Sequence, residues 1–345
     1  MRILVIRNSA MGDVALAAPV LKAFTETYPN DEIVLVTRKT FHPFFRGIKN
    51  IHLVDTDYTD RHKGVGGIYQ LHKDIEKTGK IDVVIDLHGV IRSKMFRTLF
   101  STKGAKVFVI DKGRKEKKDL IKGLSKTQLK HTVERYTDVF IKAGFPLEVS
   151  TSPSISVTES ANKKTKEVLV GSELKIGIAP FAKHGLKQWP LIEMKSLMDL
   201  ISENSTVHFY LLGGSSEGAV LQEIAPSNST ILAGKYSLEE ELGIISNLDL
   251  VITLDSSNMH MASLVGTPVI SIWGATDPLA GFGAWGQPIE RSISNTELNC
   301  RPCSIYGKGT CARKDFACMT QLTAQIVYER ILKTGLIPNA DLTAT

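Results

Sequence analysis

The chain lacks any apolar run of the roughly 18 residues that a membrane-spanning helix requires. Its N-terminal sequence, MRILVIRNSAMGD, interrupts its apolar stretch at Arg7 and Asp13, so we expect no secretory signal peptide. Aromatic residues make up only 7% of the sequence, and the hydrophobic and charged fractions of 43% and 23% are those of an ordinary globular protein. We therefore expect a cytoplasmic protein.

Cysteine is also scarce, and the few cysteines are clustered. The 345 residues include four, which follow one another as C-x2-C-x7-C-x6-C: Cys300, Cys303, Cys311 and Cys318. Because disulfides are disfavoured in the cytoplasm, the main interpretations are a structural zinc site of four thiolates and a loop of reduced cysteines, with a redox or disulfide role as a third. A catalytic metal is disfavoured, since four protein ligands leave no open coordination position.

Two common nucleotide-binding signatures are absent as well. The sequence contains neither a G-x-G-x-x-G fingerprint nor a Walker sequence after any predicted strand. A dehydrogenase and a P-loop phosphotransferase are therefore poorly supported.

Positive charge is concentrated in one segment. Residues 112–130 contain eight lysines and arginines against two acidic residues, a net charge of +6 that equals the net charge of the whole chain. Such a run is most often just a solvated face. The alternative is a docking patch for an anionic surface, such as a phosphate-bearing lipid or the inner leaflet of a membrane.

The order of predicted strands and helices indicates two α/β domains. The chain is long for a single core, and apolar strands alternate with helices in both halves. The first half has predicted strands at 3–7, 32–37, 51–54, 81–87 and 106–110, and helices at 14–27 and 131–143. The second has strands at 174–179, 206–212, 230–233, 250–254 and 269–273, and helices at 191–202, 219–225, 238–246 and 320–333. Residues 146–164 read as a polar linker containing a short strand.

We therefore predict two Rossmann-like, doubly wound parallel-sheet domains at residues 1–155 and 165–320, followed by a C-terminal helix at 320–335. The carboxyl ends of the two sheets should face each other across an interdomain cleft, since ligands of such sheets bind at that edge. In the first domain, Asp13 follows the first strand. It either stabilises a helix N-terminus or acts as a general base on an incoming hydroxyl.

The second domain places several polar loops at the same edge. Lys183, His184 and Lys187 follow its first strand and would meet an anion. The glycines of Gly213-Gly214 let a ligand approach the backbone, and Glu217 could hold sugar hydroxyls. Asp255 and Ser256 either cap a helix or belong to an anion site with its neighbours. Taken together, these loops predict a pocket for a nucleotide diphosphate that also includes Ser257, His260 and Thr276.

Several ordered motifs resemble glycosyltransferase family 9, the ADP-heptose:lipopolysaccharide heptosyltransferases. The motifs span nearly the whole chain: R-x-S-x-x-G-D at residues 7–13, D-L-H-G-x-x-R-S at 86–93, H-T-V-E-R-Y at 131–136, K-x-W-P at 187–190, G-G-x-x-E at 213–217, and Asp255-Ser256-Ser257 with Met259-His260, Ala262 and Gly266-Thr267-Pro268.

The resemblance implies a GT-B architecture and inverting transfer without a catalytic metal. Asp13 would be the general base and Lys187 would neutralise the departing diphosphate. The donor site would comprise Ser9, Lys183, Gly213, Gly214, Glu217, Asp255, Ser256, Ser257, His260 and Thr276. The acceptor site would comprise His88, Arg92, Lys115, Lys117 and Lys118. The cysteine cluster, which recurs in some family members, would then be structural.

The partners implied are ADP-heptose and a lipopolysaccharide core acceptor, with peripheral contact at the inner face of the inner membrane and no nucleic acid. Phe181 and Ser257-Asn258 depart from the family's usual phosphate loops, so the donor follows less directly than the reaction class. The alternatives are another nucleotide-sugar donor, a GT-B epimerase or hydrolase, and a zinc-containing nucleic-acid-binding protein. Aromatic residues for base stacking are scarce near the basic run, which disfavours the last.

Overall fold

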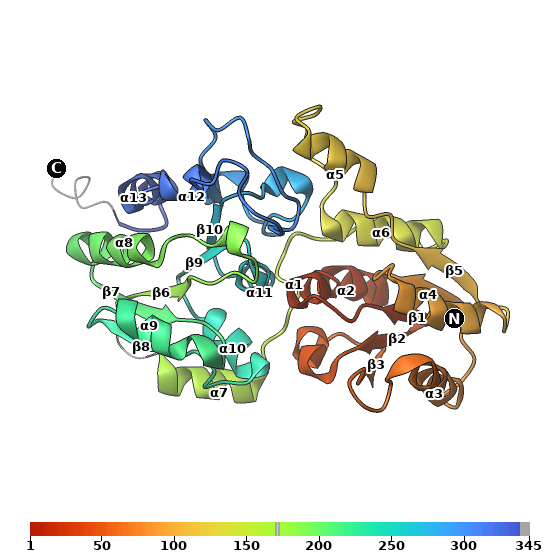
Figure 1. Cartoon of the computed structure of the whole chain (residues 1–345). Helices are drawn as coiled ribbons and strands as arrows, with labels where there is room; N and C mark the ends of the chain where they lie inside the picture. The colour runs from red at the N-terminus through yellow and green to blue at the C-terminus, as the bar shows by residue number, and fades with distance from the viewer. Residues whose placement is uncertain (170, 172, 339–345) are drawn as a thin grey trace. The chain divides into compact units, whose positions relative to one another are not determined.

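The computed structural model describes residues 1–169, 171 and 173–338. The chain divides into two compact units. The first comprises Met1–Lys112 and Lys130–Ser156, and the second comprises Gly113–Leu129 and the chain from Val157 onward. Both are layered α/β structures, as the sequence predicts (Figure 1).

The first unit is built on a parallel sheet that, in the described part of the chain, has five strands. These are β1 (Arg2–Ile6), β2 (Glu32–Thr37), β3 (Ile51–Asp55), β4 (Val83–Asp86) and β5 (Lys106–Val109), in the order β3-β2-β1-β4-β5. The central strands are buried on both faces, which explains their near-continuous apolar sequences. Strand order reverses between β1 and β4, so their carboxyl ends form the expected ligand-binding position.

Helices cover both faces of this sheet. They are α1 (Met11–Ala15), α2 (Ala18–Thr27), α3 (Gly64–Glu76), α4 (Ile91–Ser101) and α6 (Thr132–Lys142), with the 3-10 helix η1 (Lys39–Phe45) after β2. On one face, α3 and α4 bury Leu71 and Phe96 against Leu4. On the other, α2 packs on α6 through Phe24 and Phe140, whose ring centroids are 5.3 Å apart.

The prediction of one helix over residues 14–27 is wrong in detail. The helix is interrupted after α1, and α2 begins anew at Ala18 with Pro19 in its first turn. Proline lacks the N–H that a continuous helix would need at that point, whereas a first-turn position leaves no bond unmade. Asp13 therefore lies on the short helix α1, in the segment that follows β1.

The second unit is built on a parallel sheet of six strands within the described residues. These are β6 (Leu174–Ala179), β7 (Val207–Leu211), β8 (Ser229–Ile231), β9 (Leu250–Leu254), β10 (Val269–Trp273) and β11 (Ser292–Ser294), in the order β11-β10-β9-β6-β7-β8. Here the order reverses between β6 and β9, which makes their carboxyl ends the second expected binding position.

The helices that follow residue 157 in this unit are α7 (Glu159–Val168), α8 (Leu191–Asn204), α9 (Gly218–Ile224), α10 (Leu238–Ile245), α11 (Ser257–Val265), α12 (Ala317–Thr320) and α13 (Ala324–Leu332). Short 3-10 turns occur at η2 (Gly185–Lys187), η3 (Ser215–Glu217), η4 (Pro278–Ala280) and η5 (Ile289–Arg291). Helices α8 and α13 bury Leu197 and Val327 on the sheet. No helix in the described part of the chain is both long and apolar enough to cross a membrane.

The predicted strand within residues 146–164 does not form. Residues 146–157 are irregular, and α7 begins after Thr158, whose hydroxyl accepts a hydrogen bond from Ala161 N (3.3 Å). A side-chain cap of this kind satisfies an N–H that the first turn leaves unpaired. Helix α7 packs on α10, with Ala161 and Thr165 buried.

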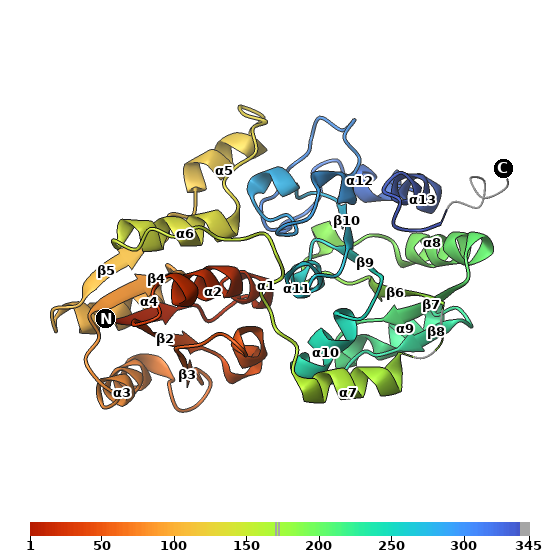
Figure 2. The same cartoon turned by 180° about the vertical axis from the view of Figure 1, so that it is seen from behind.

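The basic run forms helix α5 (Arg114–Ile121), and residues Gly113–Leu129 cluster with the second unit. Leu120 and Leu129 pack with Ala280 and Ile305 in a small apolar cluster. Leu129 N also donates to the carbonyl of Leu279 (2.9 Å). Both views show α5 beside the loops that follow β10 (Figure 2). The charged segment is therefore a packed helix with an apolar underside.

Candidate functional site

In the first unit, polar side chains gather where β1 and β4 end. Arg7 Nη2 lies 2.8 Å from Asp13 Oδ2, and Arg7 Nη1 donates to the carbonyl of Leu87 (2.7 Å) just beyond β4. The arginine thus joins the two loops at the reversal point. The Arg7 side chain is 7% exposed, whereas Asp13 is 34% exposed, so the pair offers a carboxylate rather than a cation to solvent.

Tyr136 on α6 contacts both members of the Arg7–Asp13 pair. Its hydroxyl donates to the carbonyl of Asp13 (3.0 Å), and the Arg7 guanidinium lies 5.6 Å from the centre of its ring. The ring is fully buried, and burial raises the pKa of its hydroxyl, so Tyr136 stays a neutral donor. The backbone and the charge of Asp13 are both held in place.

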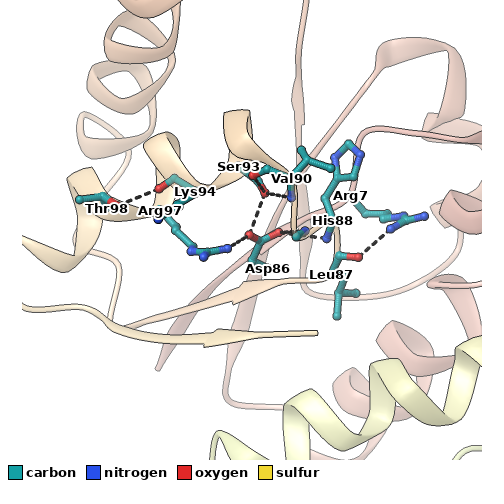
Figure 3. Close-up of polar contacts among 10 residues, drawn as sticks. Arg7, Asp86, Leu87, His88, Val90, Ser93, Lys94, Arg97 and Thr98 are labelled. Atoms are coloured by element: carbon teal, nitrogen blue, oxygen red, sulfur yellow. Dashed lines mark hydrogen bonds and ion pairs between the residues drawn. The ribbon is translucent and has the colours of Figure 1, made fainter. Parts of the chain in front are cut away.

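Asp86 at the end of β4 organises the neighbouring loop (Figure 3). Its carboxylate is fully buried and accepts from His88 N (2.9 Å), Gly89 N (2.8 Å) and the Ser93 hydroxyl (2.8 Å), and it pairs with Arg97. A buried carboxylate requires such partners, because an unpaired one would cost several kcal/mol. Asp86 is therefore a positioning residue.

His88 is the side chain that this loop presents. Its Nε2 lies 3.4 Å from the Ser9 hydroxyl. Burial, followed by the nearby charge of Arg7, lowers the pKa of His88 to about 4, so the ring is neutral at pH 7. A neutral imidazole can donate one hydrogen bond and accept another, which suits contact with a hydroxyl.

Arg92 is held by stacking. Its guanidinium carbon lies 4.3 Å from the centre of the Tyr58 ring, and the Tyr58 hydroxyl accepts from Asn8 Nδ2 (3.1 Å). Asn8 Oδ1 in turn accepts from the Thr56 hydroxyl (2.9 Å). This chain of contacts presents an exposed guanidinium in a fixed orientation at the same edge of the sheet as Asp13.

In the second unit, an ion pair occupies the reversal point between β6 and β9. Lys187 Nζ lies 2.7 Å from Asp255 Oδ2, with side-chain exposures of 16% and 7%. The Thr276 hydroxyl also donates a hydrogen bond to Asp255 Oδ2 (2.8 Å), so the contact of Thr276 is with this carboxylate. An ammonium has three donor hydrogens, and Asp255 uses one of them, which leaves Lys187 able to bind an anion.

The N-terminus of α11 lies beside this pair. Its N-cap residue, Ser256, makes no side-chain cap; its hydroxyl lies 3.1 Å from the Thr253 hydroxyl instead. The interpretation of Ser256 as a helix cap is therefore wrong. Asp255 is engaged by Lys187 and Thr276, so the first turn, which begins at Ser257, presents its N–H groups and partial positive charge to the loop edge. His260 is buried within this helix, one turn further along.

Further cations surround the loop after β6. Burial and the nearby charges of Lys187, Lys308 and Lys183 lower the pKa of His184. Three ammonium groups therefore contribute positive potential at one position. Such potential attracts an anionic diphosphate and has little effect on a neutral sugar.

The loop after β7 is shaped by Glu217. Its carboxylate accepts a short hydrogen bond from Gly214 N (2.6 Å), and Gly234 N donates to the carbonyl of Gly213 (3.1 Å). A side chain on Gly234 would collide with Ser215 at 2.5 Å, which explains the glycine. The second oxygen of a carboxylate held in this way can still accept from a ribose or sugar hydroxyl.

The structure distributes the predicted acceptor residues between the two units. His88 and Arg92 belong to the first, and the lysines of α5 belong to the second. Of these lysines, Lys115 and Lys118 are exposed, but Lys117 is only 6% exposed, with its ammonium 4.2 Å from the centre of the Phe282 ring. Lys117 therefore anchors α5.

The four cysteines are free thiols. Within the residues that the structure describes, no group of three or more His, Cys, Asp or Glu side chains is placed to hold a metal ion. Burial raises the pKa of the Cys318 thiol to about 11; the nearby charge of Arg301 acts to lower it, and the neighbouring cysteine charges act to raise it. The segment is organised by Arg301, whose buried guanidinium donates to the carbonyls of Thr276 (2.9 Å) and Asn295 (2.8 Å).

Sequence reasoning did not identify Arg7, Tyr136, Asp86 or Arg301 as site residues. Arg7, Asp86 and Tyr136 lie within the family motifs. Arg7 and Tyr136 each make a contact across 80 or more positions of sequence, whereas the side-chain contacts of Asp86 lie within 11 positions. The sequence signal that could have identified Arg7 and Asp86 is a charged residue at the end of an apolar strand. Arg301 lies between Cys300 and Cys303 in a segment without regular structure, so no strand boundary marks it.

Comparisons with known proteins bear on the family and the fold of this chain. A family model described as glycosyltransferase family 9 (heptosyltransferase) matches residues 68–310. Lipooligosaccharide heptosyltransferase 2 of Campylobacter jejuni is 23% identical over 96% of this chain and 99% of that protein. The structure of a family 9 glycosyltransferase from Veillonella parvula superposes with a TM-score of 0.77 at 20% identity, covering 97% of each chain. That of the Escherichia coli ADP-heptose lipopolysaccharide heptosyltransferase II gives 0.70 at 19%, covering 97% and 98%.

Proposed function

Because this chain belongs to glycosyltransferase family 9, we propose that it transfers heptose from ADP-heptose to a lipopolysaccharide core acceptor. The observation that carries the proposal is the Lys187–Asp255 pair, which lies with an uncapped helix N-terminus where the order of the second sheet reverses. The names of the similar proteins supply the sugar and the acceptor class.

The second unit would bind the donor. Its diphosphate would lie between Lys187 and the first turn of α11, with Lys183 adding charge. Glu217 would accept from ribose hydroxyls, and Gly214 would allow the backbone to approach them. Ser9 of the first unit completes the proposed donor set, whose remaining members are Gly213, Asp255, Ser256, Ser257, His260 and Thr276.

The first unit would hold the acceptor and its proton. Among the described residues, Arg7 and Ala10 N both contact Asp13 Oδ2, so Oδ1 is the oxygen left to receive a proton from an acceptor hydroxyl. His88 and Arg92, with Lys115, Lys117 and Lys118, would bind the acceptor's hydroxyls and anionic groups. For Lys117 this role would require its ammonium to leave the Phe282 ring.

The reaction is a single displacement with inversion. The acceptor oxygen forms a bond to the anomeric carbon of heptose as the bond from that carbon to the β-phosphate oxygen breaks. The hydroxyl proton passes to Asp13, and the electron pair of the broken bond remains on ADP. Lys187 stabilises the charge that develops on this leaving group, the role that a divalent cation serves in other transferases. We propose that no metal is required for the step.

The test compares two variants at Asp13. Asp13→Asn retains a hydrogen-bonding partner for Arg7 but cannot accept a proton, so transfer should fall by 10²-fold or more while ADP binding, followed by thermal shift, is unchanged. Normal turnover in Asp13→Asn would contradict the general-base role. Consumption of donor without any acceptor would favour the epimerase or hydrolase alternative.

The cysteine cluster would have a structural role apart from this reaction. Four thiolates holding zinc remain a prediction, which metal analysis of the purified protein can test. The protein would act in the cytoplasm, in peripheral contact with the inner face of the membrane that holds its acceptor.

A further inference from the structure

Helix α5 and the loop at Ile305–Tyr306 enclose a pocket of about 310 Å³ in the second unit. Its lining combines cations with apolar side chains: Arg114, Lys117, Lys118, Ile121, Lys122, Ile305 and Tyr306. Four of these, at positions 114, 118, 121 and 122, follow the spacing of one helix face. The pocket is therefore amphipathic.

Packing contacts beside the pocket fix α5 to the unit. Leu120 is 2% exposed and packs with Ala280 and Ile305, while Lys117 lies over the Phe282 ring. Because these contacts hold the helix, α5 cannot rotate to bury the face that carries positions 114, 118, 121 and 122. That face remains outward as a rigid surface.

Large apolar side chains are exposed beside the cations. Ile121 is 38% exposed, Tyr306 49% and Leu124 71%. The chain turns sharply at Gly123, where φ is +69°, and Leu124 N donates back to the carbonyl of Asp119 (3.0 Å). This turn holds Leu124 at the end of the helix.

The charges are not neutralised locally. In the part of the chain that the structure describes, no carboxylate forms an ion pair with Arg114, Lys118 or Lys122. Exposed aliphatic side chains beside these cations match the two chemical layers of an anionic bilayer, phosphate headgroups above acyl chains. A nucleic acid or an acidic protein surface would use the cations and leave Leu124 in water.

We propose that the face of α5 formed by Arg114, Lys118, Ile121 and Lys122, with Leu124 and Tyr306, docks on an anionic phospholipid bilayer. The proposal rests on the proposed function only for its biological setting and specifies the surface that makes the membrane contact. The lysines and the arginine contact phosphate headgroups, and Leu124 and Ile121 enter the acyl boundary. Docking would hold the second unit at the surface where a lipid-linked acceptor resides.

The experiment is co-sedimentation with vesicles of phosphatidylglycerol and phosphatidylcholine, compared with phosphatidylcholine alone. The intact protein should bind only the anionic vesicles and be released by 0.5 M salt, conditions chosen to be well above physiological ionic strength. Arg114→Glu/Lys122→Glu should bind at least tenfold more weakly. Lys163→Glu/Lys166→Glu on α7, an equal change in charge at exposed sites, should bind like the intact protein.

A second pair of variants tests the apolar contact. Leu124→Asp should also lose binding at least tenfold, whereas Ile192→Asp on α8, at a site of similar exposure (67%), should not. Wild-type binding by Leu124→Asp would overturn the proposal, since cations alone would then explain the attraction. Equal losses in the control variants would overturn it too, because binding would follow net charge and not this face.

Vesicle binding requires neither donor nor turnover, so the outcome is independent of the proposed transfer reaction. Transfer to a deacylated, water-soluble acceptor provides the converse measurement. Leu124→Asp should carry out that reaction normally, and failure of the intact protein to do so would count against the proposed function alone.

Discussion

At the residue scale, Lys187 has two roles. It neutralises Asp255, which is 7% exposed, and it is the cation proposed to meet the leaving diphosphate. Removing one partner of such a pair strands a buried charge, at a typical cost of about 3–5 kcal/mol. Loss of activity in a simple Lys187 variant would therefore not separate catalysis from folding.

We predict that a double variant separates them. Lys187→Met should lower both stability and transfer, whereas Lys187→Met/Asp255→Asn should recover most of the lost stability, because no buried charge is then unpaired. Turnover of the double variant should remain about 10²–10³-fold below that of the intact protein, since the charge on departing ADP is not stabilised. Thermal unfolding and transfer assays on the same samples measure the two effects. Recovery of turnover with stability would show that Lys187 is only structural.

Glu241 on α10 provides a test of the electrostatics of the second unit. Burial raises the pKa of this carboxyl to about 7. Its native form thus keeps a proton that the unfolded chain releases above about pH 4.5, and stability falls as pH rises from there through about 7. Glu241→Gln should be more stable than the intact protein at pH 8 by about 1–2 kcal/mol and equally stable at pH 4. Denaturant unfolding at the two pH values would detect it; an equal effect at both would contradict the raised pKa.

At the element scale, the loop at Ile305–Gly309 supports the lysine stem. A side chain on Gly307 would lie 2.5 Å from Lys187 Cγ, whereas one on Gly309 would meet nothing within 4 Å. Both glycines have positive φ, +73° and +103°, so either substitution strains the backbone. The two positions therefore differ in what they touch.

Gly307→Ala should lower transfer at least tenfold by displacing Lys187. Gly309→Ala should keep turnover near that of the intact protein, although it costs about 1 kcal/mol or more of stability from the unfavourable φ. Steady-state transfer kinetics with both variants provide the comparison. Equal turnover in the two would mean that the loop does not position Lys187.

The accuracy with which the sequence predicts a strand or helix depends on how much of that element is buried. Strands β2, β6, β9 and β10 have the bounds that their apolar runs predict, because strands covered on both faces leave an unbroken hydrophobic signal. Helices α3, α4, α5 and α7 were not predicted. Helix α7 buries only Ala161 and Thr165, so its sequence has little apolar periodicity, and α3 contains three glycines in its first four residues.

The prediction of the site residues also depended on how clear the neighbouring strands are in the sequence. The position of Asp13, Lys187 and Asp255 at the edge of a sheet could be predicted, because each lies in the segment that follows a strand with a clear apolar run; their roles stay predictions. Their partners could not, since Tyr136 reaches Asp13 from α6 and Gly307 reaches Lys187 from a loop without regular structure. Contacts between distant segments depend on packing, which a local pattern does not contain.

At the scale of the whole molecule, each unit is a parallel sheet with its polar groups at the point where strand order reverses. Both groups have the chemistry that one displacement needs: a carboxylate on a buried scaffold in the first and a cation beside a helix N-terminus in the second. We propose that the two groups serve a single transfer reaction, the class of activity of glycosyltransferase family 9, to which the chain belongs.

The most direct measurement is a mass-spectrometric transfer assay. The purified protein is incubated with ADP-heptose and a heptose-free lipopolysaccharide core acceptor, in the presence of a chelator and with an acceptor-free control. We predict that the acceptor gains one heptose and that ADP is released in equal amount, with donor left intact when acceptor is omitted. Donor consumption without acceptor, or no heptose addition by a folded protein that binds ADP, would contradict the account.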